Sequence, residues 1–168
     1  MQFKQYEDSL IKTASSLLAI DSPSGYTDKA SEFVLQAAKE LGYPAYRNNL
    51  GNVIVPVEGE NNEESVALSA HIDTLGLMVR SITDNGHLML TAVGSPILPT
   101  LDGEYCRIHT MEGKVYTGTI LSLSPAIHVF PDASTRPRDD ANMAVRIDEI
   151  VHSKEDVEAL GIRPGDFV

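Results

Sequence analysis

The strongest constraint on the fold lies between residues 75 and 148, where short apolar segments alternate with turn signals. Strands are predicted at 75–82, 87–93, 104–110, 114–121 and 143–148. Asp84, Asn85 and Gly86 separate the first two strands, and this combination favours a tight hairpin because Asn and Gly tolerate positive φ. Short strands repeated at such spacing are typical of a small closed barrel or sandwich. We therefore expect residues 74–165 to form a separate β domain.

The preceding part of the chain follows a helical pattern and then a strand pattern. Apolar residues recur at helical spacing from about residue 2 to 20 and again from 28 to 41, which predicts two amphipathic helices. Thr27 is the expected N-cap of the second helix, and Gly42 is its expected C-terminal stop. Strands are predicted at 43–48, 52–57 and 65–70. Two helices plus three strands form part of an α/β layer, so we assign residues 1–73 to an α/β domain.

The end of the sequence predicts a short helix followed by the start of a strand. Ser153 is the expected N-cap of a helix over 154–160, and Gly161 is its expected stop. The α/β layer lacks the elements that would cover both faces of its sheet. We therefore expect residues 166–168 to begin a return to that domain, with its remainder following Val168. The alternative is a complete small protein with a polar sheet edge.

Charge and hydropathy exclude several classes of partner. The formal net charge is -11, from 24 acidic against 13 basic residues, and no Lys/Arg stripe offsets it, so we expect no nucleic-acid partner. The N-terminus lacks an apolar signal core. No segment approaches the roughly 18 apolar residues that would span a bilayer, which predicts a cytoplasmic protein with no membrane partner. Cys106 is the only cysteine, and we interpret it as a small strand residue.

His71 and Asp73 interrupt an apolar run at the end of the strand predicted at 65–70. Residues i and i+2 of an extended segment point to the same side, so the two side chains are expected to lie together where α/β layers place ligands. A carboxylate beside an imidazole fixes its tautomer and raises its basicity, as metal-binding histidines require. The pair therefore predicts a histidine metal ligand with an orienting aspartate. The spacing fits a structural His–Asp hydrogen bond equally well.

An ordered set of motifs favours the metal-ligand interpretation of His71 over the structural one. The segments SPSGY, NNLGNVIV, ALSAHIDTLGLMV, DNGHLMLTAVG, KVYTGTI and HSKEDVEALGIRPGDFV resemble the glutamyl aminopeptidase family of dinuclear metallopeptidases. That family includes tetrahedral aminopeptidases and proteins once labelled cellulases or endoglucanases. The resemblance covers nearly the whole chain. It implies an α/β metallopeptidase domain that is interrupted, soon after the His-x-Asp strand, by an inserted small β-barrel acting as a lid or dimerisation domain.

The resemblance also implies roles for the two residues of the motif. His71 would be a ligand to one of two divalent metal ions, zinc, cobalt or manganese, and Asp73 would be the catalytic-site aspartate that orients it. The other ligands and the general base would lie in the later half of the peptidase domain, beyond Val168. Many family members have a glutamate after this aspartate, whereas this chain has Thr74. The family's preference for acidic N-terminal residues is therefore not carried over to this chain.

These inferences together favour the N-terminal half of a metal-dependent aminopeptidase-like hydrolase. Its substrate would be a peptide, its barrel would mediate a homo-oligomer, and residues 1–168 alone would be inactive. Two alternatives remain: a deacylase or other amide hydrolase of a small metabolite, and a non-catalytic dimerisation or binding module in which His71 is structural. Among the other histidines, only His128, in the loop at 122–142, is a candidate for overhanging the site.

Overall fold

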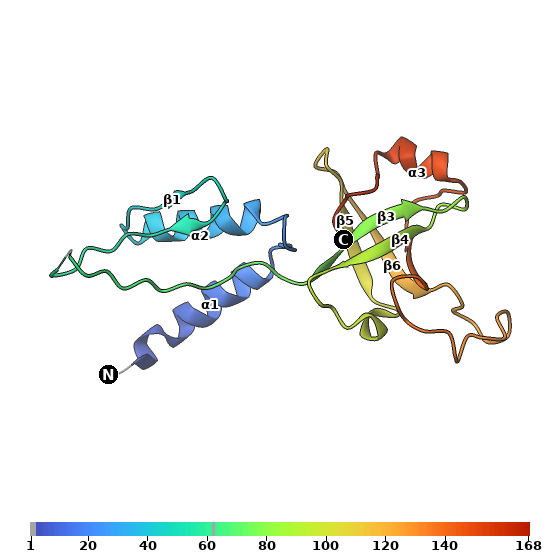
Figure 1. Cartoon of the computed structure of the whole chain (residues 1–168), viewed down its shortest axis with the longest axis horizontal. Coiled ribbons are helices and arrows are strands. Elements are labelled where there is room, and N and C mark those ends of the chain that lie inside the picture. Colours follow the sequence, from blue (N-terminus) through green and yellow to red (C-terminus); the bar gives the residue numbers. More distant parts are fainter. Residues whose placement is uncertain (1–2, 62) are drawn as a thin grey trace. The chain divides into compact units, whose positions relative to one another are not determined.

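The computed structural model describes residues 3–61 and 63–168 and consists of two compact units, Met1–Thr74 and Leu75–Val168 (Figure 1). The division lies one residue beyond the boundary at residue 73 that the sequence predicts. Among the described residues, no helix combines the length and the apolar character needed to cross a membrane.

The first unit contains the two helices that the apolar period predicts. Its elements are a 3-10 helix, η1 (Phe3–Tyr6), the helices α1 (Glu7–Leu18) and α2 (Asp28–Glu40), and the strands β1 (Tyr46–Arg47) and β2 (Val53–Ile54). Thr27 occupies the N-cap position of α2, but its side chain makes no capping hydrogen bond. Gly42 follows α2 with a φ of 84°, a conformation that glycine adopts without strain.

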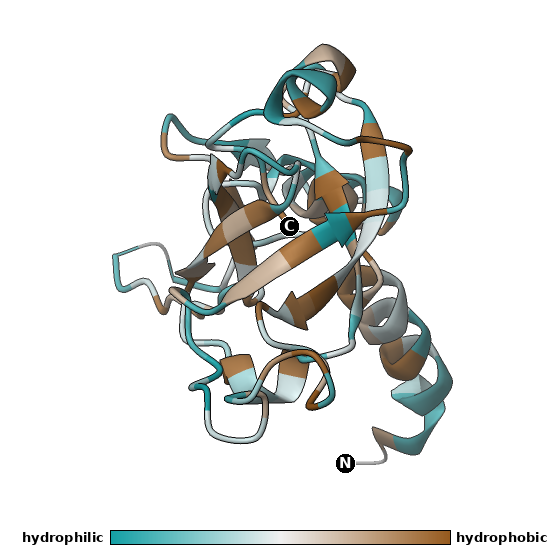
Figure 2. Cartoon of the chain, turned by 90° about the vertical axis from the view of Figure 1, so that its right-hand side faces the viewer, coloured by the Kyte–Doolittle hydropathy of each residue, from teal (hydrophilic) through white to brown (hydrophobic). Residues whose placement is uncertain are grey.

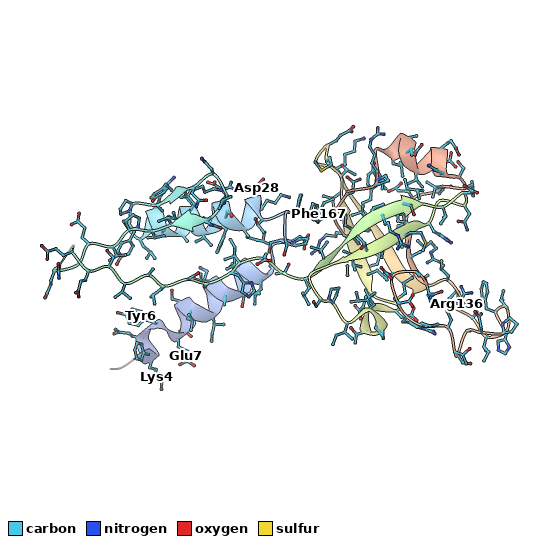
Figure 3. All side chains as sticks on the ribbon, viewed as in Figure 1. Lys4, Tyr6, Glu7, Asp28, Arg136 and Phe167 are labelled. Carbon is cyan, nitrogen blue, oxygen red and sulfur yellow. The ribbon has the colours of Figure 1, made fainter. Side chains whose placement is uncertain are left out.

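Polar contacts connect α2 to the short strands. Arg47 of β1 donates a hydrogen bond to Asp28 in the first turn of α2, and the Oγ of Ser31 donates to the carbonyl oxygen of Gly51 at 3.2 Å. Apolar packing is sparse by comparison, because α1 buries no residue and α2 buries only Ala30, Ser31 and Ala38. The labelled side chains of Lys4, Tyr6 and Glu7 at the start of the unit are exposed (Figure 3).

The prediction of a strand at 65–70 is wrong. The segment has no strand partner within the described part of the chain, and Val66 and Leu68 are 92% and 99% exposed. Apolar alternation indicates a capacity for burial, but a strand forms only where a neighbour satisfies its backbone N–H and C=O groups. Only Thr74, at the end of this run, forms a parallel bridge, to Pro23. The α/β layer therefore has two helices and two very short strands here, instead of three strands.

The second unit is a curled antiparallel sheet with one helix (Figure 1). Its elements are β3 (Gly76–Ile82), β4 (Leu88–Val93), η2 (Leu98–Leu101), β5 (Tyr105–His109), β6 (Val115–Ser122), β7 (Met143–Ile147) and α3 (Lys154–Leu160). The strand order is β3-β4-β7-β6-β5, so all five strands predicted between residues 75 and 148 are confirmed. Gly86, with a φ of 81°, lies in the predicted hairpin between β3 and β4.

Both edges of this sheet bond to the end of the chain. The backbone N–H of Leu77 in β3 donates to the carbonyl oxygen of Val168 at 2.8 Å, and that of His109 in β5 donates to the carbonyl oxygen of Phe167 at 2.8 Å. Backbone hydrogen bonds thus continue from one edge of the sheet to the other through residues 165–168. These residues lie with the second unit, and a return to the first domain after them remains a prediction.

The core of the molecule lies inside the curled sheet. Brown, hydrophobic segments run along its strands in Figure 2, and the burial of β6 alternates along its length as the pleat requires. Twelve buried hydrophobic residues form one cluster: Leu77, Val79, Ile82, Leu88, Leu90, Ile108, Ile120, Met143, Val145, Ile147, Val157 and Ile162. The helix α3 adds Val157 to it, and Ser153 with Asp156 forms a capping box that fixes the start of this helix.

Candidate metal site

The candidate site lies in the first unit, where the loop between α1 and α2 meets residues 71–74. Ser22 is buried in this loop, with 1% of its surface exposed. Its Oγ donates to the carbonyl oxygen of Ile72 at 3.1 Å, and its own carbonyl oxygen accepts from the backbone N–H of Thr74 at 2.8 Å. Pro23, whose ring fixes φ, bridges to Thr74. The loop therefore holds the backbone on both sides of Asp73.

His71 and Asp73 are hydrogen-bonded to each other, which confirms the contact predicted from their spacing. The Nδ1 of His71 lies 3.1 Å from Oδ1 of Asp73 and 3.0 Å from its carbonyl oxygen. Both partners are acceptors, so Nδ1 carries the proton and donates, and the lone pair of a neutral ring lies on Nε2. The side chain of His71 is 86% exposed, and no described residue bonds its Nε2.

Ser24 completes this arrangement and was not among the residues that the sequence predicted for the site. Its Oγ donates to Oδ2 of Asp73, the carboxylate oxygen that His71 leaves unused. The Ser24 hydrogen bond is the main cause of a lowered pKa of Asp73. Desolvation, the next largest effect, opposes it, and the hydrogen bond from His71 lowers the pKa further. The carboxylate is therefore ionised at neutral pH and accepts a hydrogen bond on each oxygen.

The donor set fits one position of a metal site. A neutral imidazole nitrogen that faces solvent, with the other nitrogen bonded to a carboxylate, is the form in which histidine binds zinc. A catalytic zinc site takes about three protein ligands, whereas the described residues contain no cluster of three or more His, Cys, Asp or Glu side chains arranged to hold an ion. Residues 3–61 and 63–168 thus contain one candidate ligand and no complete coordination shell.

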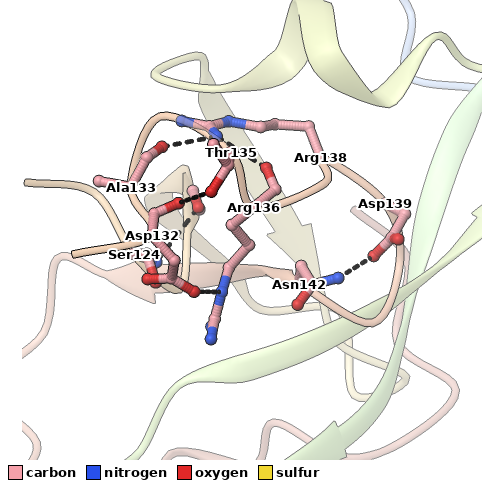
Figure 4. A network of polar contacts seen from close by, with 9 residues as sticks. Ser124, Asp132, Ala133, Thr135, Arg136, Arg138, Asp139 and Asn142 are labelled. Atoms are coloured by element: carbon pink, nitrogen blue, oxygen red, sulfur yellow. Dashed lines mark hydrogen bonds and ion pairs between the residues drawn. The ribbon is translucent and has the colours of Figure 1, made fainter. Parts of the chain in front are cut away.

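The remaining candidate residues lie in the second unit. His128 is exposed in the loop between β6 and β7, and that loop is ordered by other side chains (Figure 4). Asp132 accepts hydrogen bonds from Ser124 at 2.9 Å and from Arg136 at 2.8 Å, and the Ser124 bond is the main cause of its lowered pKa. Cys106 lies in β5 as predicted, and burial raises the pKa of its thiol to about 12. This thiol stays protonated and is not a nucleophile.

Comparison with known proteins places this arrangement in a peptidase family. Residues 51–168 match the family model described as M42 glutamyl aminopeptidase. The match covers well over half of the chain and begins before His71 and Asp73. The chain belongs to the M42 glutamyl aminopeptidase family.

Individual relatives agree with this assignment. The chain is 40% identical over 152 residues to the Bacillus subtilis protein named "Putative aminopeptidase YhfE", covering 90% of this chain and 44% of that one. It is 30% identical to the lysyl aminopeptidase of Pyrococcus furiosus, covering 87% and 42%. The structure of the TET1 peptidase of Pyrococcus horikoshii, which can assemble into a tetrahedron or a large octahedral shell, matches with a TM-score of 0.76 and 29% identity, covering 94% and 45%. The chain spans less than half the length of these relatives.

Proposed function

We propose that the chain is the N-terminal part of a metal-dependent aminopeptidase that removes N-terminal residues from peptides. The observation that carries this proposal is the exposed His71, whose Nδ1 is bonded to an ionised Asp73, in a chain of the M42 family. His71 would hold one of two divalent ions, zinc, cobalt or manganese, through Nε2. Bound divalent ions would polarise the scissile carbonyl and lower the pKa of a bound water.

The chain's own contribution is to present a correctly oriented ligand. Asp73 accepts the Nδ1 proton of His71, which holds the ring in the tautomer with a free Nε2 and increases the basicity of that nitrogen. The backbone around the pair is held by Ser22 through Ile72 and Thr74. The remaining ligands and the base that activates water would come from sequence that the matched relatives have and these 168 residues do not.

The second unit is proposed to be the inserted β-barrel of such an enzyme, serving as a lid or as a contact between subunits. Its first strand begins directly after the site segment, at Gly76, and its two edges are joined through residues 165–168. The ability of the Pyrococcus horikoshii relative to assemble into a tetrahedron or a large octahedral shell supports a homo-oligomer. The same unit would then separate the site segment from the rest of the peptidase domain in the sequence.

A chimera tests this function without requiring the chain to act alone. Residues 1–168 would replace the matching segment of the Bacillus subtilis relative, and hydrolysis of aminoacyl-arylamides would be followed. We expect turnover that a chelator abolishes and that added zinc, cobalt or manganese restores. His71→Ala should abolish it, whereas the matched control His152→Ala, an exposed histidine of the second unit, should retain it.

Two results would contradict the proposal. One is a folded chimera with no chelator-sensitive peptidase activity while the unmodified relative is active. The other is full activity in His71→Ala. Residues 1–168 alone should show no turnover, because two-metal hydrolysis needs both ions fixed about 3.5–4 Å apart, and the described residues hold no complete site.

A further inference from the structure

Two serines of one loop bond to the site segment in different ways. Ser22 is buried, and within the described residues it bonds to backbone groups, namely the carbonyl oxygen of Ile72 and the N–H of Thr74. Ser24 is exposed and donates its hydroxyl proton to the side chain of Asp73. The first serine fixes the path of the chain, and the second acts on the carboxylate itself.

We propose that Ser24 is a positioning residue for the metal ligand His71, acting through Asp73. The inference rests on the proposed function and adds a residue to it. Oδ2 of Asp73 accepts from Ser24 and Oδ1 accepts from His71, so the carboxylate is held at both oxygens. The orientation of the imidazole is then set by a chain of two hydrogen bonds that begins at the loop between α1 and α2.

The hydrogen bond from Ser24 matters because the side chains of Asp73 and His71 are both exposed. The side chain of Asp73 is 38% exposed and that of His71 is 86% exposed, so surrounding packing does little to restrict either. A carboxylate held at one oxygen turns about its χ2 torsion, which is broad and roughly two-fold, and water competes for the freed oxygen. Holding Oδ2 removes this freedom. The ring of His71 then keeps Nδ1 as its donor and leaves Nε2 available.

The conformation of the loop between α1 and α2 places the Ser24 hydroxyl beside Asp73. The loop is held in place beside residues 72–74 by the bridge between Pro23 and Thr74 and by the two hydrogen bonds of Ser22. Gly25 follows with a φ of 92°, which lets the chain turn away immediately after Ser24. The serine is thus placed by the backbone on both of its sides, and its hydroxyl needs no further packing to reach Asp73.

The tautomer of His71 in the metal-free chain is the decisive readout, measured from the 15N chemical shifts of its two ring nitrogens. Wild type is expected to be almost entirely the Nδ1–H form, and Ser24→Ala a mixture of the two neutral forms. Ser24→Thr keeps a hydroxyl and should restore the wild-type shifts. Ser15→Ala, at an exposed serine of α1, is the matched control and should leave the tautomer unchanged.

Metal affinity gives the second readout, measured in the chimera by competition with a chromophoric chelator for zinc. We expect about tenfold weaker binding in Ser24→Ala, the lower end of the effect of losing an outer partner of a metal ligand, and recovery in Ser24→Thr. A wild-type tautomer in Ser24→Ala would overturn this inference while leaving the role of His71 intact. Zinc binding that does not depend on His71 would instead overturn the proposed function.

Discussion

The two units of the chain differ in what holds them together. The second unit encloses all twelve residues of the hydrophobic cluster, whereas the only buried hydrophobic residues in the described part of the first unit are Ala30 and Ala38. The candidate site lies in the first unit. Its geometry therefore depends on hydrogen bonds between a loop and a short segment, and the contrast shows that a side-chain arrangement can be held without a hydrophobic core beneath it.

The first unit also leaves several of its large apolar side chains exposed. Leu18, Val66 and Leu68 are 73%, 92% and 99% exposed, so the first unit does not itself cover these side chains. Leu17, Val34 and Val53 are half-buried. Exposed apolar surface of this kind promotes association.

Separating the units tests the comparison most severely. Residues 75–168 alone should fold, with dispersed amide NMR signals and one cooperative urea transition, because their core is complete. Residues 1–74 alone should give neither, since burial of two alanines does not offset the entropy of ordering the chain. A cooperative transition in residues 1–74 would break the comparison.

Leucine truncations measure the same difference within the intact chain. Leu88 in β4 is 0% exposed and Leu68 is 99% exposed. Leu88→Ala should lower the free energy of unfolding by about 2–5 kcal/mol, and Leu68→Ala should change it by about 0.5 kcal/mol or less, both measured by urea denaturation. Equal costs at the two positions would show that the first unit buries Leu68 in solution.

Removing a helix cap should also cost more stability in the second unit than in the first, but by a smaller amount than the leucine truncations. Ser153 accepts a hydrogen bond from the backbone N–H of Asp156 at 3.1 Å, while Thr27 makes no capping bond to α2. Ser153→Ala should lower the opening free energy of α3 amides by about 1 kcal/mol. Thr27→Ala should leave that of α2 within about 0.5 kcal/mol. Amide hydrogen exchange measures both, and a larger effect of Thr27→Ala would reverse the expected order.

The smallest effect concerns an exposed carboxylate of the second unit. Asp148 accepts hydrogen bonds from Tyr105 at 2.5 Å and Thr117 at 2.7 Å, and these, Tyr105 first, lower its pKa from the ordinary value of 3.8. The stabilisation is therefore present above that value and is lost as the pH falls through the folded pKa. Tyr105→Phe should raise the pKa of Asp148, as followed by carboxyl 13C shifts. Its stability deficit relative to wild type should shrink in acid, and a deficit that is independent of pH would contradict the assignment.

Sequence separation explains which features could be predicted. The helices α1 and α2 and the five strands of the curled sheet follow from local periodicity. The contact of His71 with Asp73 could be predicted because the partners are two residues apart and share one side of an extended segment. The strand at 65–70 could not be judged in this way, since its existence depends on a neighbour that local alternation does not reveal.

Ser24 illustrates the same limit at the site. Its partner Asp73 is 49 residues away, and serine beside Pro23 and Gly25 has a sufficient local interpretation as a turn residue. The motif SPSGY contributed to the family resemblance, but nothing in its composition predicts that the Ser24 hydroxyl bonds to the Asp73 carboxylate. Only the register between the loop and residues 72–74 brings the two side chains together.

The pairing of both sheet edges with residues 165–168 has a consequence during protein synthesis. β7 ends at Ile147, so the 21 residues from 148 to 168 must still be added before either edge can pair. At about 5–20 residues per second this takes about 1–4 s. For that interval the nascent chain carries two open strand edges, which are templates for pairing with other chains. Translation speed over this short stretch, which includes α3, thus sets how long each new molecule is exposed to aggregation.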